Sequence, residues 1–386
     1  MRNVCIVVQG YYPKDVRVRK EAMALIRRGY RVSVIALRDL SEKRFEIVDD
    51  VNVCRISLKK RRGGILRYIY EYIFFLIIAI VKINILDIKE RFDAVHVNTL
   101  PDFLVFCAIV QKLKGKRIVL DMHEIAPEFF MSKYGVKRSN PVIQILLMVE
   151  KASLRFADGI ITVNEPIRRI FQQRAVPKKP IEVVMNTVDL AVMPTFKNRA
   201  HAGFNCVYHG TLTQVYCLDV AITGFALVCQ NFPDMQFHIF GSGTDSEKLK
   251  ALSGDLHVSD RVIFHGEMKH SHMIEALSVM DLGVLSSRKD VFLDLTFSNK
   301  LSEYIYLHIP VVSSDLETTK YYFSNDQILF FEAGNPNDLA QKIGFAYNNP
   351  QHMSKMSDAA YERAKEFRWD IMADKYIATI EGKHAQ

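Results

Sequence analysis

Short runs of β-branched and other apolar residues recur along the chain and alternate with longer amphipathic stretches. Such runs predict buried strands, and the stretches between most of them are long enough for crossover helices. Alternating strands and helices are typical of an α/β fold with a mainly parallel sheet. The predicted strands are residues 3–8, 31–36, 93–97, 117–121, 159–163 and 181–184, then 204–209, 236–240, 261–265, 281–285, 310–313 and 328–331.

This rhythm of strands occurs twice, which predicts two Rossmann-like domains. A chain of 386 residues is also too long for one ordinary core. Residues 186–202 lack aliphatic periodicity and are predicted to link domain 1–190 to domain 203–368. The last segment, 369–386, has a helical pattern with no strand after it, and we expect this helix to pack back on the first domain.

Residues 298–312 read SNKLSEYIYLHIPVV, which predicts a short helix followed by a buried strand. Lys300 and Glu303 lie three positions apart near the start of this helix. The N-terminus of a helix already favours phosphate. The pair is therefore either an ordinary intrahelical ion pair or part of a phosphate-binding site. Its neighbours Ser298 and Asn299 are further candidate donor-binding residues.

Charged residues follow two predicted strands of the first half. Asp15 and Arg17 lie after the first strand, and His123 and Glu124 lie after strand 117–121. Ligands bind at the carboxyl edge of parallel sheets. We expect Asp15 or Arg17 to face a ligand, although a solvated helix start explains some of this charge. We expect His123 or Glu124 to contact sugar hydroxyls, although a lone histidine is more often a structural group.

Three loops that follow strands in the second half carry glycine, which allows close approach of the backbone to a ligand. The first could cradle a phosphate, the second lacks the third glycine of a dinucleotide fingerprint, and the third suits contacts with a flat base. The residues concerned are Gly210, Thr211, Thr213, Gly241, Gly243, Gly266 and Glu267.

Composition narrows the class of partner. The net charge of +8 suits an anionic ligand such as a nucleotide diphosphate. The basic residues are dispersed and no recognition module is present, so no nucleic acid is expected. The six cysteines form no CxxC pair and predict reduced core residues. No Walker A sequence or paired-histidine motif occurs, so neither a metal nor a resident cofactor is expected.

The sequence KKRR at 59–62 precedes a strongly apolar, aromatic stretch at 65–88. A basic run beside such a helix is typical of an in-plane membrane anchor, and the alternative is a helix buried in the protein. We expect no spanning segment, because Glu71 and Lys82 interrupt the apolar run 73–81. The first residues do not resemble a signal peptide. The expected location is cytoplasmic, at the inner face of the plasma membrane, with peripheral contact through Lys59–Ile88.

The order of motifs resembles the GT-B fold glycosyltransferases of family 4, which are retaining nucleotide-sugar transferases of bacterial surface polysaccharides. The matching segments cover almost the whole chain and are DVRVRKEAMALIRRGYRV, LDMHEIAPE, YHGTLTQVYCLDVAI, FGSGTDSEKL, RVIFHGEM and SNKLSEYIYLHIPVVSSD. The resemblance implies two Rossmann-like domains that face a central cleft, an acceptor-side first domain and a donor-binding second domain.

The resemblance also implies roles for single residues. Glu303 matches the glutamate that holds the ribose hydroxyls, and Gly210 and Thr211 match the glycine loop beside the diphosphate. Gly266 and Glu267 match the loop against the base. His123 matches the histidine near the transferred sugar, with Glu124 beside it. Lys300 is placed to stabilise the departing diphosphate.

The sequence departs from the family pattern in two places. The usual Arg and Lys after the glycine loop are absent, with Val215 and Cys217 in that region, and Lys300, Arg288 and Lys289 are the candidate substitutes. The glutamate expected eight residues before Glu303 is Leu295, next to Asp294, so the donor sugar is not predicted.

The leading hypothesis is a retaining glycosyltransferase that moves a sugar from a nucleotide diphosphate sugar to a lipid-linked glycan. One alternative is a nucleotide-sugar epimerase of the same fold. Another is a non-catalytic glycosyltransferase-like subunit, which the absent Arg and Lys would suit. The base, the donor sugar, the acceptor and the linkage do not follow from the sequence.

Overall fold

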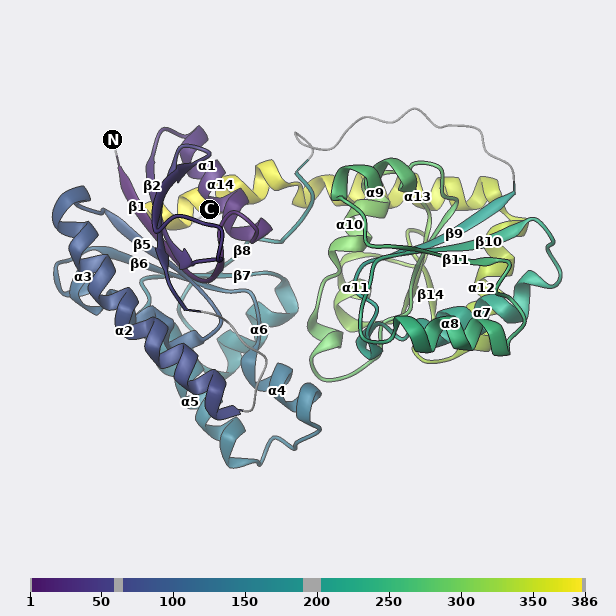
Figure 1. Cartoon of the computed structure of the whole chain (residues 1–386), viewed down its shortest axis with the longest axis horizontal. Coiled ribbons are helices and arrows are strands. Elements are labelled where there is room, and N and C mark those ends of the chain that lie inside the picture. The colour runs from purple at the N-terminus through teal and green to yellow at the C-terminus, as the bar shows by residue number, and fades with distance from the viewer. Residues whose placement is uncertain (1, 59–64, 190–202, 384–386) are drawn as a thin grey trace. The chain divides into compact units, whose positions relative to one another are not determined.

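The computed structural model describes residues 2–58, 65–189 and 203–383, which form two compact units (Figure 1). Unit 1 comprises Met1–Asn186 and Asp370–Gln386, and unit 2 comprises Thr187–Trp369. Most of the predicted linker, residues 190–202, lies outside the described residues. Each unit is an α/β body, as the alternating pattern predicts.

The sheet of unit 1 has eight strands in the order β3-β4-β2-β1-β5-β6-β7-β8. All six strands predicted for this half are present, and every neighbouring pair is parallel except β3 and β4. The strands are β1 (Asn3–Tyr11), β2 (Arg31–Leu37), β3 (Phe45–Val48), β4 (Val51–Ile56), β5 (Ala94–Asn98), β6 (Arg117–Met122), β7 (Gly159–Thr162) and β8 (Ile181–Val183).

Local signals define the helix ends in unit 1. The carboxylate of Asp15 accepts a hydrogen bond from the amide of Val18 and so caps α1, which ends before Gly29 in the left-handed conformation. The helices are α1 (Val16–Arg27), α2 (Ile65–Glu90), η1 (Asp102–Ala108), α3 (Ile109–Leu113), α4 (Ala126–Tyr134), α5 (Pro141–Phe156), α6 (Glu165–Arg174) and α14 (Trp369–Glu381).

The last helix, α14, packs within unit 1 beside α1 (Figure 1). The hydroxyl of Tyr376 lies 3.0 Å from Nδ1 of His96 on β5. Arg117 at the start of β6 donates to the carbonyl of Thr379 at 2.9 Å. The chain therefore leaves unit 1 after β8 and returns to it through α14.

Unit 2 has a wholly parallel sheet in the order β11-β10-β9-β12-β13-β14, which contains all six strands predicted for this half. Its strands are β9 (Phe204–His209), β10 (Met235–Phe240), β11 (Val262–Gly266), β12 (Leu282–Leu285), β13 (Val311–Ser314) and β14 (Leu329–Phe331). Its helices are η2 (Gln214–Tyr216), α7 (Leu218–Cys229), α8 (Ser246–Asp255), α9 (His270–Leu277), η3 (Leu293–Leu295), α10 (Asn299–Tyr306), α11 (Glu317–Tyr322), α12 (Pro336–Asn348), α13 (Pro350–Ala364) and η4 (Lys365–Phe367).

The cysteines behave as the composition predicts. All six are free thiols, and five of them are buried, with Cys217 partly exposed. Burial raises the pKa of Cys107 to about 12. The five buried thiols therefore serve as small apolar groups of the two cores.

Helix α2 has two different faces. Glu71, Phe75, Ala79, Ile83 and Asp87 recur at every fourth position and are buried. The opposite face is exposed and apolar. The stretch Arg67–Glu90 of α2 is long and apolar enough to cross a membrane, a property that core helices of soluble proteins share. The basic run 59–62 lies outside the described residues.

Candidate active site

The donor-side candidates gather where the strand order of unit 2 reverses. Strand β9 lies between β10 and β12, and ligands of open parallel sheets bind at the carboxyl ends of such strands. The glycine loop, defined here as Gly210–Thr213, follows β9. Ser286 follows β12 and donates a hydrogen bond to the carbonyl of Tyr216 at 2.9 Å. This hydrogen bond joins η2, which follows the glycine loop, to the end of β12.

Lys300 lies over the glycine loop. Its Nζ is 3.9 Å from the centre of the Tyr216 ring and 5.5 Å from that of Tyr208. A Cβ at Gly210 would lie 2.3 Å from Cε of Lys300, so glycine leaves the room that this side chain occupies. Burial lowers the pKa of Lys300 to about 8, although Glu303 acts in the opposite direction. The group is therefore mainly a cation at neutral pH.

The glycines of the second loop serve close packing between loops. A Cβ at Gly241 would lie 1.9 Å from the carbonyl oxygen of Gly210, and one at Gly243 would lie 2.0 Å from that of Leu212. The amide of Gly241 donates to the carbonyl of Gly266 at 2.7 Å. The three glycine-containing loops therefore form one cluster. Contact of Gly241 or Gly243 with a phosphate stays a prediction.

Glu303 follows Lys300 by one helical turn and points between two histidines. Its Oε2 is 3.1 Å from Nε2 of His209, and its Oε1 is 3.3 Å from Nε2 of His270. Burial, reinforced by the charge of Lys300, lowers the pKa of His209 to about 3, so this ring is neutral. Sequence reasoning missed both histidines, although His209 directly precedes Gly210 at a strand end.

The remaining donor-side candidates surround these loops. Ser298 is the N-cap residue of α10, and Asn299 is its exposed first residue. Thr211 is exposed and its carbonyl accepts a hydrogen bond from Tyr208, while Thr213 is partly exposed. Glu267 is exposed and lies 3.4 Å from the hydroxyl of Ser242. The structure thus places these side chains at the edge of the sheet, and their roles stay predictions.

The residues at the two departures from the family pattern lie as follows in unit 2. Arg288 pairs with Asp290 at 2.7 Å, and Lys289 pairs with Asp315 at 3.3 Å. Lys300 is thus the candidate substitute that lies over the glycine loop. Leu295 is buried, and the carboxylate of Asp294 accepts from the amide of Glu317 at 3.1 Å.

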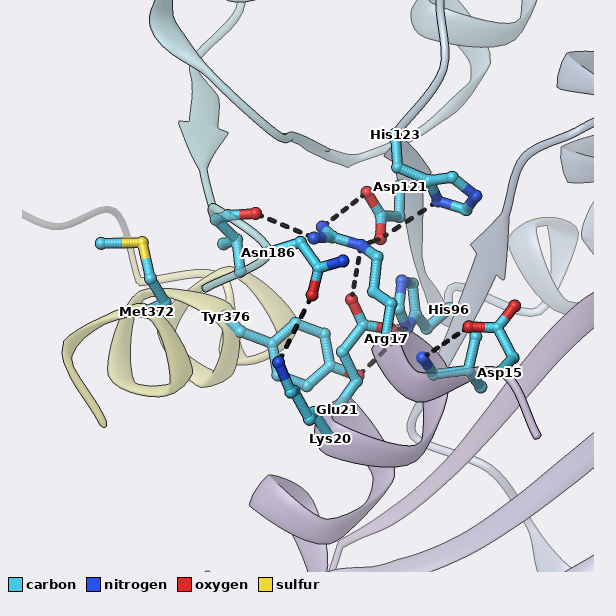
Figure 2. A network of polar contacts seen from close by, with 12 residues as sticks. Asp15, Arg17, Lys20, Glu21, His96, Asp121, His123, Asn186, Met372 and Tyr376 are labelled. Atoms are coloured by element: carbon cyan, nitrogen blue, oxygen red, sulfur yellow. Dashed lines mark hydrogen bonds and ion pairs between the residues drawn. The ribbon is translucent and has the colours of Figure 1, made fainter. Parts of the chain in front are cut away.

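In unit 1, the prediction for Arg17 needs correction. Its side chain is 6% exposed and makes a bidentate pair with Asp121, from Nε at 2.6 Å and from a terminal nitrogen at 3.0 Å (Figure 2). Its other terminal nitrogen donates to the carbonyl of Val184 at 3.0 Å. An arginine so placed pairs with buried charges inside unit 1 and is not exposed to face a ligand. Asp15, the other candidate, is engaged as the cap of α1.

Glu21, His96 and Asp121 lie around Arg17 and are all buried. Their ligand atoms are close enough to suggest a metal site, but the Arg17 guanidinium already supplies the positive charge there, with Nε 3.2 Å from Glu21. Burial and the neighbouring Asp121 raise the pKa of Glu21 well above its usual range. Burial lowers the pKa of His96 to about 4. The cluster is a closed network of polar groups.

His123 and Glu124 follow β6 and are both partly exposed, as the strand-end position predicts. Nδ1 of His123 lies 3.7 Å from Oδ2 of Asp121. Burial raises the pKa of Tyr72 on α2 to about 12, and Glu124 reinforces this shift, so the two groups are within electrostatic reach. Catalytic roles for His123 and Glu124 stay predictions.

Comparison with known proteins agrees with this architecture. The model of Glycosyltransferase Family 4 matches residues 15–192, and that of Glycosyl transferases group 1 matches residues 196–363. The O-antigen biosynthesis glycosyltransferase WclY of Escherichia coli is 25% identical over 300 residues, which are 75% of this chain and 80% of that protein.

Two solved structures share the fold. Sucrose-phosphate synthase from Thermosynechococcus elongatus has a TM-score of 0.79 at 16% identity and covers 99% of both chains. Anabaena HepE in complex with UDP has a TM-score of 0.70 at 14% identity and covers 99% of this chain and 100% of that one. The fold, the family matches and the relative define a glycosyltransferase with the GT-B fold. The chain belongs to the family 4-like glycosyltransferases.

Proposed function

We propose that this glycosyltransferase moves a sugar from a nucleotide diphosphate sugar to a lipid-linked glycan during the synthesis of a cell-surface polysaccharide. The position of Lys300 above the glycine loop is the observation that carries the proposal, because it puts a cation where a diphosphate would rest. The name of WclY supports the polysaccharide, and HepE with bound UDP supports the type of donor.

In the proposed donor complex, Lys300 and the first amides of α10 bind the diphosphate, and Glu303 accepts hydrogen bonds from two ribose hydroxyls. The bond between the sugar's anomeric carbon and the phosphate oxygen breaks, and the diphosphate leaves with the electron pair. An acceptor hydroxyl attacks from the same face and gives its proton to the leaving phosphate. This sequence retains the anomeric configuration and balances atoms and charge.

We also propose that unit 1 binds an anionic membrane surface through the exposed face of α2. This apolar face, defined by Ile69, Ile73, Ile77, Val81, Ile85 and Ile88, has side chains between 47% and 77% exposed. Of the helix's three acids, Glu71 and Asp87 point inward at 1% and 5% exposure and Glu90 is partly buried, whereas Lys89 near its end is exposed. An apolar stripe with exposed basic charge suits the interface of an acidic bilayer.

The experiment for the central proposal incubates the protein with UDP-, GDP-, ADP- and CMP-sugars and a bacterial lipid-linked glycan fraction. Transfer should release one nucleotide in step with a heavier glycan, and NMR of the product should show the donor's anomeric configuration. Release of an epimerised sugar without any acceptor would instead support the epimerase. Failure of every donor to bind, as well as to react, would support a non-catalytic subunit.

A further inference from the structure

The buried carboxylate of Asp121 is the acceptor that faces the inner nitrogen of His123. The two atoms, Oδ2 and Nδ1, are 3.7 Å apart, slightly longer than a hydrogen bond (Figure 2). Nδ1 is itself buried and makes no hydrogen bond to any residue that the structure describes. A buried ring nitrogen without a partner costs free energy, so the nearby carboxylate is its natural acceptor.

Asp121 is held in place from the opposite side. The guanidinium of Arg17 donates hydrogen bonds to both carboxylate oxygens of Asp121. Arg17 also pairs with Glu21 and donates to the carbonyl of Val184. Burial acts to raise the pKa of Asp121, but Arg17 and His123 hold it well below its usual range. The carboxylate is therefore charged and fixed, with one oxygen turned toward the histidine.

We propose that Asp121 is a positioning residue that fixes the ring and the tautomer of His123, with Arg17 as its support. This inference rests on the proposed function, because it requires that His123 contact the transferred sugar. The Asp121 carboxylate accepts the hydrogen bond of Nδ1–H, and Nε2 is then left as an acceptor. An acceptor nitrogen binds a sugar hydroxyl as donor, whereas the opposite tautomer would present N–H to it.

The arrangement explains why a strongly charged network is buried behind a strand end. Three groups on two elements, Arg17 and Glu21 on α1 and Asp121 on β6, share a site that is closed to solvent. Partners behind a functional histidine commonly set which ring nitrogen carries the proton. In this role Arg17 acts on the reaction through Asp121 and does not touch substrate.

The direct test is nitrogen-15 NMR of histidine-labelled protein, with the His123 signal assigned by its loss in His123→Gln. The neutral ring of the wild type should show the proton on Nδ1. In Asp121→Asn this preference should fall or reverse, because the amide can donate to Nδ1. A wild-type ring protonated on Nε2 would overturn the inference, even if Asp121→Asn does not fold.

Kinetics supply the second readout. Asp121→Asn should lower kcat by about 10- to 100-fold, as is common for residues that orient a functional group. Its Kd for the nucleoside diphosphate should stay within about twofold of the wild type, since that site lies in unit 2. Asp121→Glu should restore part of kcat. A kcat unchanged in Asp121→Asn would overturn the inference.

The two proposals can fail separately. The NMR signal reports the tautomer whether or not any sugar is transferred. A ring protonated on Nδ1 in a protein that transfers no sugar would overturn the proposed function and leave standing only the tautomer that Asp121 sets. Active transfer with His123 protonated on Nε2 would overturn the positioning role alone.

Discussion

The ammonium of Lys300 lies 3.9 Å from the centre of the Tyr216 ring. Within the parts of the chain that the structure describes, no salt bridge joins Lys300 to a carboxylate. An aromatic face attracts a cation without neutralising it. The charge thus stays available to an anionic ligand at the glycine loop.

The position of Lys300 depends on Gly210. In Gly210→Ala, the new Cβ would lie 2.3 Å from Cε of Lys300, so the lysine must move. We expect the loss of one charge-assisted contact, about 1.5–3 kcal/mol, or roughly 10- to 100-fold weaker binding of the nucleoside diphosphate. Isothermal titration with the diphosphate that the wild type prefers measures this change.

Gly334→Ala is the matched control for that substitution. Gly334 also has a positive φ, +84°, but among the described residues no atom beyond its two chain neighbours lies within 4 Å of its Cβ position. It should cost stability through backbone strain and leave nucleotide affinity unchanged. Equal losses of affinity in both variants would show that strain, and not the displacement of Lys300, causes the effect.

Glu303 should make the nucleotide site prefer ribose over 2′,3′-dideoxyribose. The wild type should bind a nucleoside diphosphate more tightly than its 2′,3′-dideoxy form, and Glu303→Gln should reduce that preference by about tenfold, since a charged acceptor is lost. Competition binding with the two nucleotides measures it. Glu247→Gln removes an exposed acid of the same unit and should keep the preference. If Glu303→Gln also keeps the preference for the ribose form, Glu303 does not accept hydrogen bonds from the ribose hydroxyls.

Arg17 should matter for the stability of unit 1. Arg17→Met leaves the buried Asp121 unpaired and should lower the free energy of unfolding by about 3–5 kcal/mol in a urea titration at pH 7. Arg28→Met breaks an exposed pair with Asp374, whose side chains are 58% and 64% exposed, and should cost about 0–1 kcal/mol.

The loss of stability caused by Arg17→Met should depend on pH. Because Arg17 lowers the pKa of Asp121, the pair stabilises the fold above the ordinary pKa of an aspartate, and this stability is lost as the pH falls. The gap between wild type and Arg17→Met should therefore shrink in acid. A gap that stays constant from pH 7 down to the acid transition would contradict the pairing.

The apolar face of α2 should control membrane binding. Ile77→Glu combined with Ile85→Glu should abolish co-sedimentation with vesicles that contain phosphatidylglycerol, because each exposed isoleucine contributes about 1.5–3 kcal/mol when buried in lipid. Leu227→Glu is the control, since Leu227 is 49% exposed and lies in unit 2 while Ile77 is 56% exposed. Binding that survives the double substitution would rule out this face.

The fold could be predicted from the sequence pattern, because most strands are short, mainly apolar runs separated by amphipathic stretches. The hairpin of β3 and β4 was missed. Phe45 and Ile47 on β3 are exposed, and its turn is Asp49-Asp50, both with positive φ, where glycine or asparagine is the usual signal. An edge hairpin of this kind leaves little hydrophobic pattern to find.

The candidate site could be predicted from the sequence less completely than the fold. Strand ends indicated Gly210 and His123, and helical spacing predicted the helix that carries Lys300, since both signals depend on local sequence. The burial of Arg17 did not follow, because its partner Asp121 is 104 positions away. The contact of Glu303 with His270 likewise depends on how separate loops meet. Long-range pairing of charges is invisible to local patterns.

The affinity for nucleoside diphosphate as a function of pH tests the role of Lys300 most directly. With a pKa of about 8, the lysine is protonated at pH 7 and loses its proton as the pH rises through 8. Only about a tenth remains charged at pH 9, so affinity should fall about tenfold between pH 7 and pH 9. Lys300→Arg should show a flat profile over this range. A flat profile for the wild type would contradict the account.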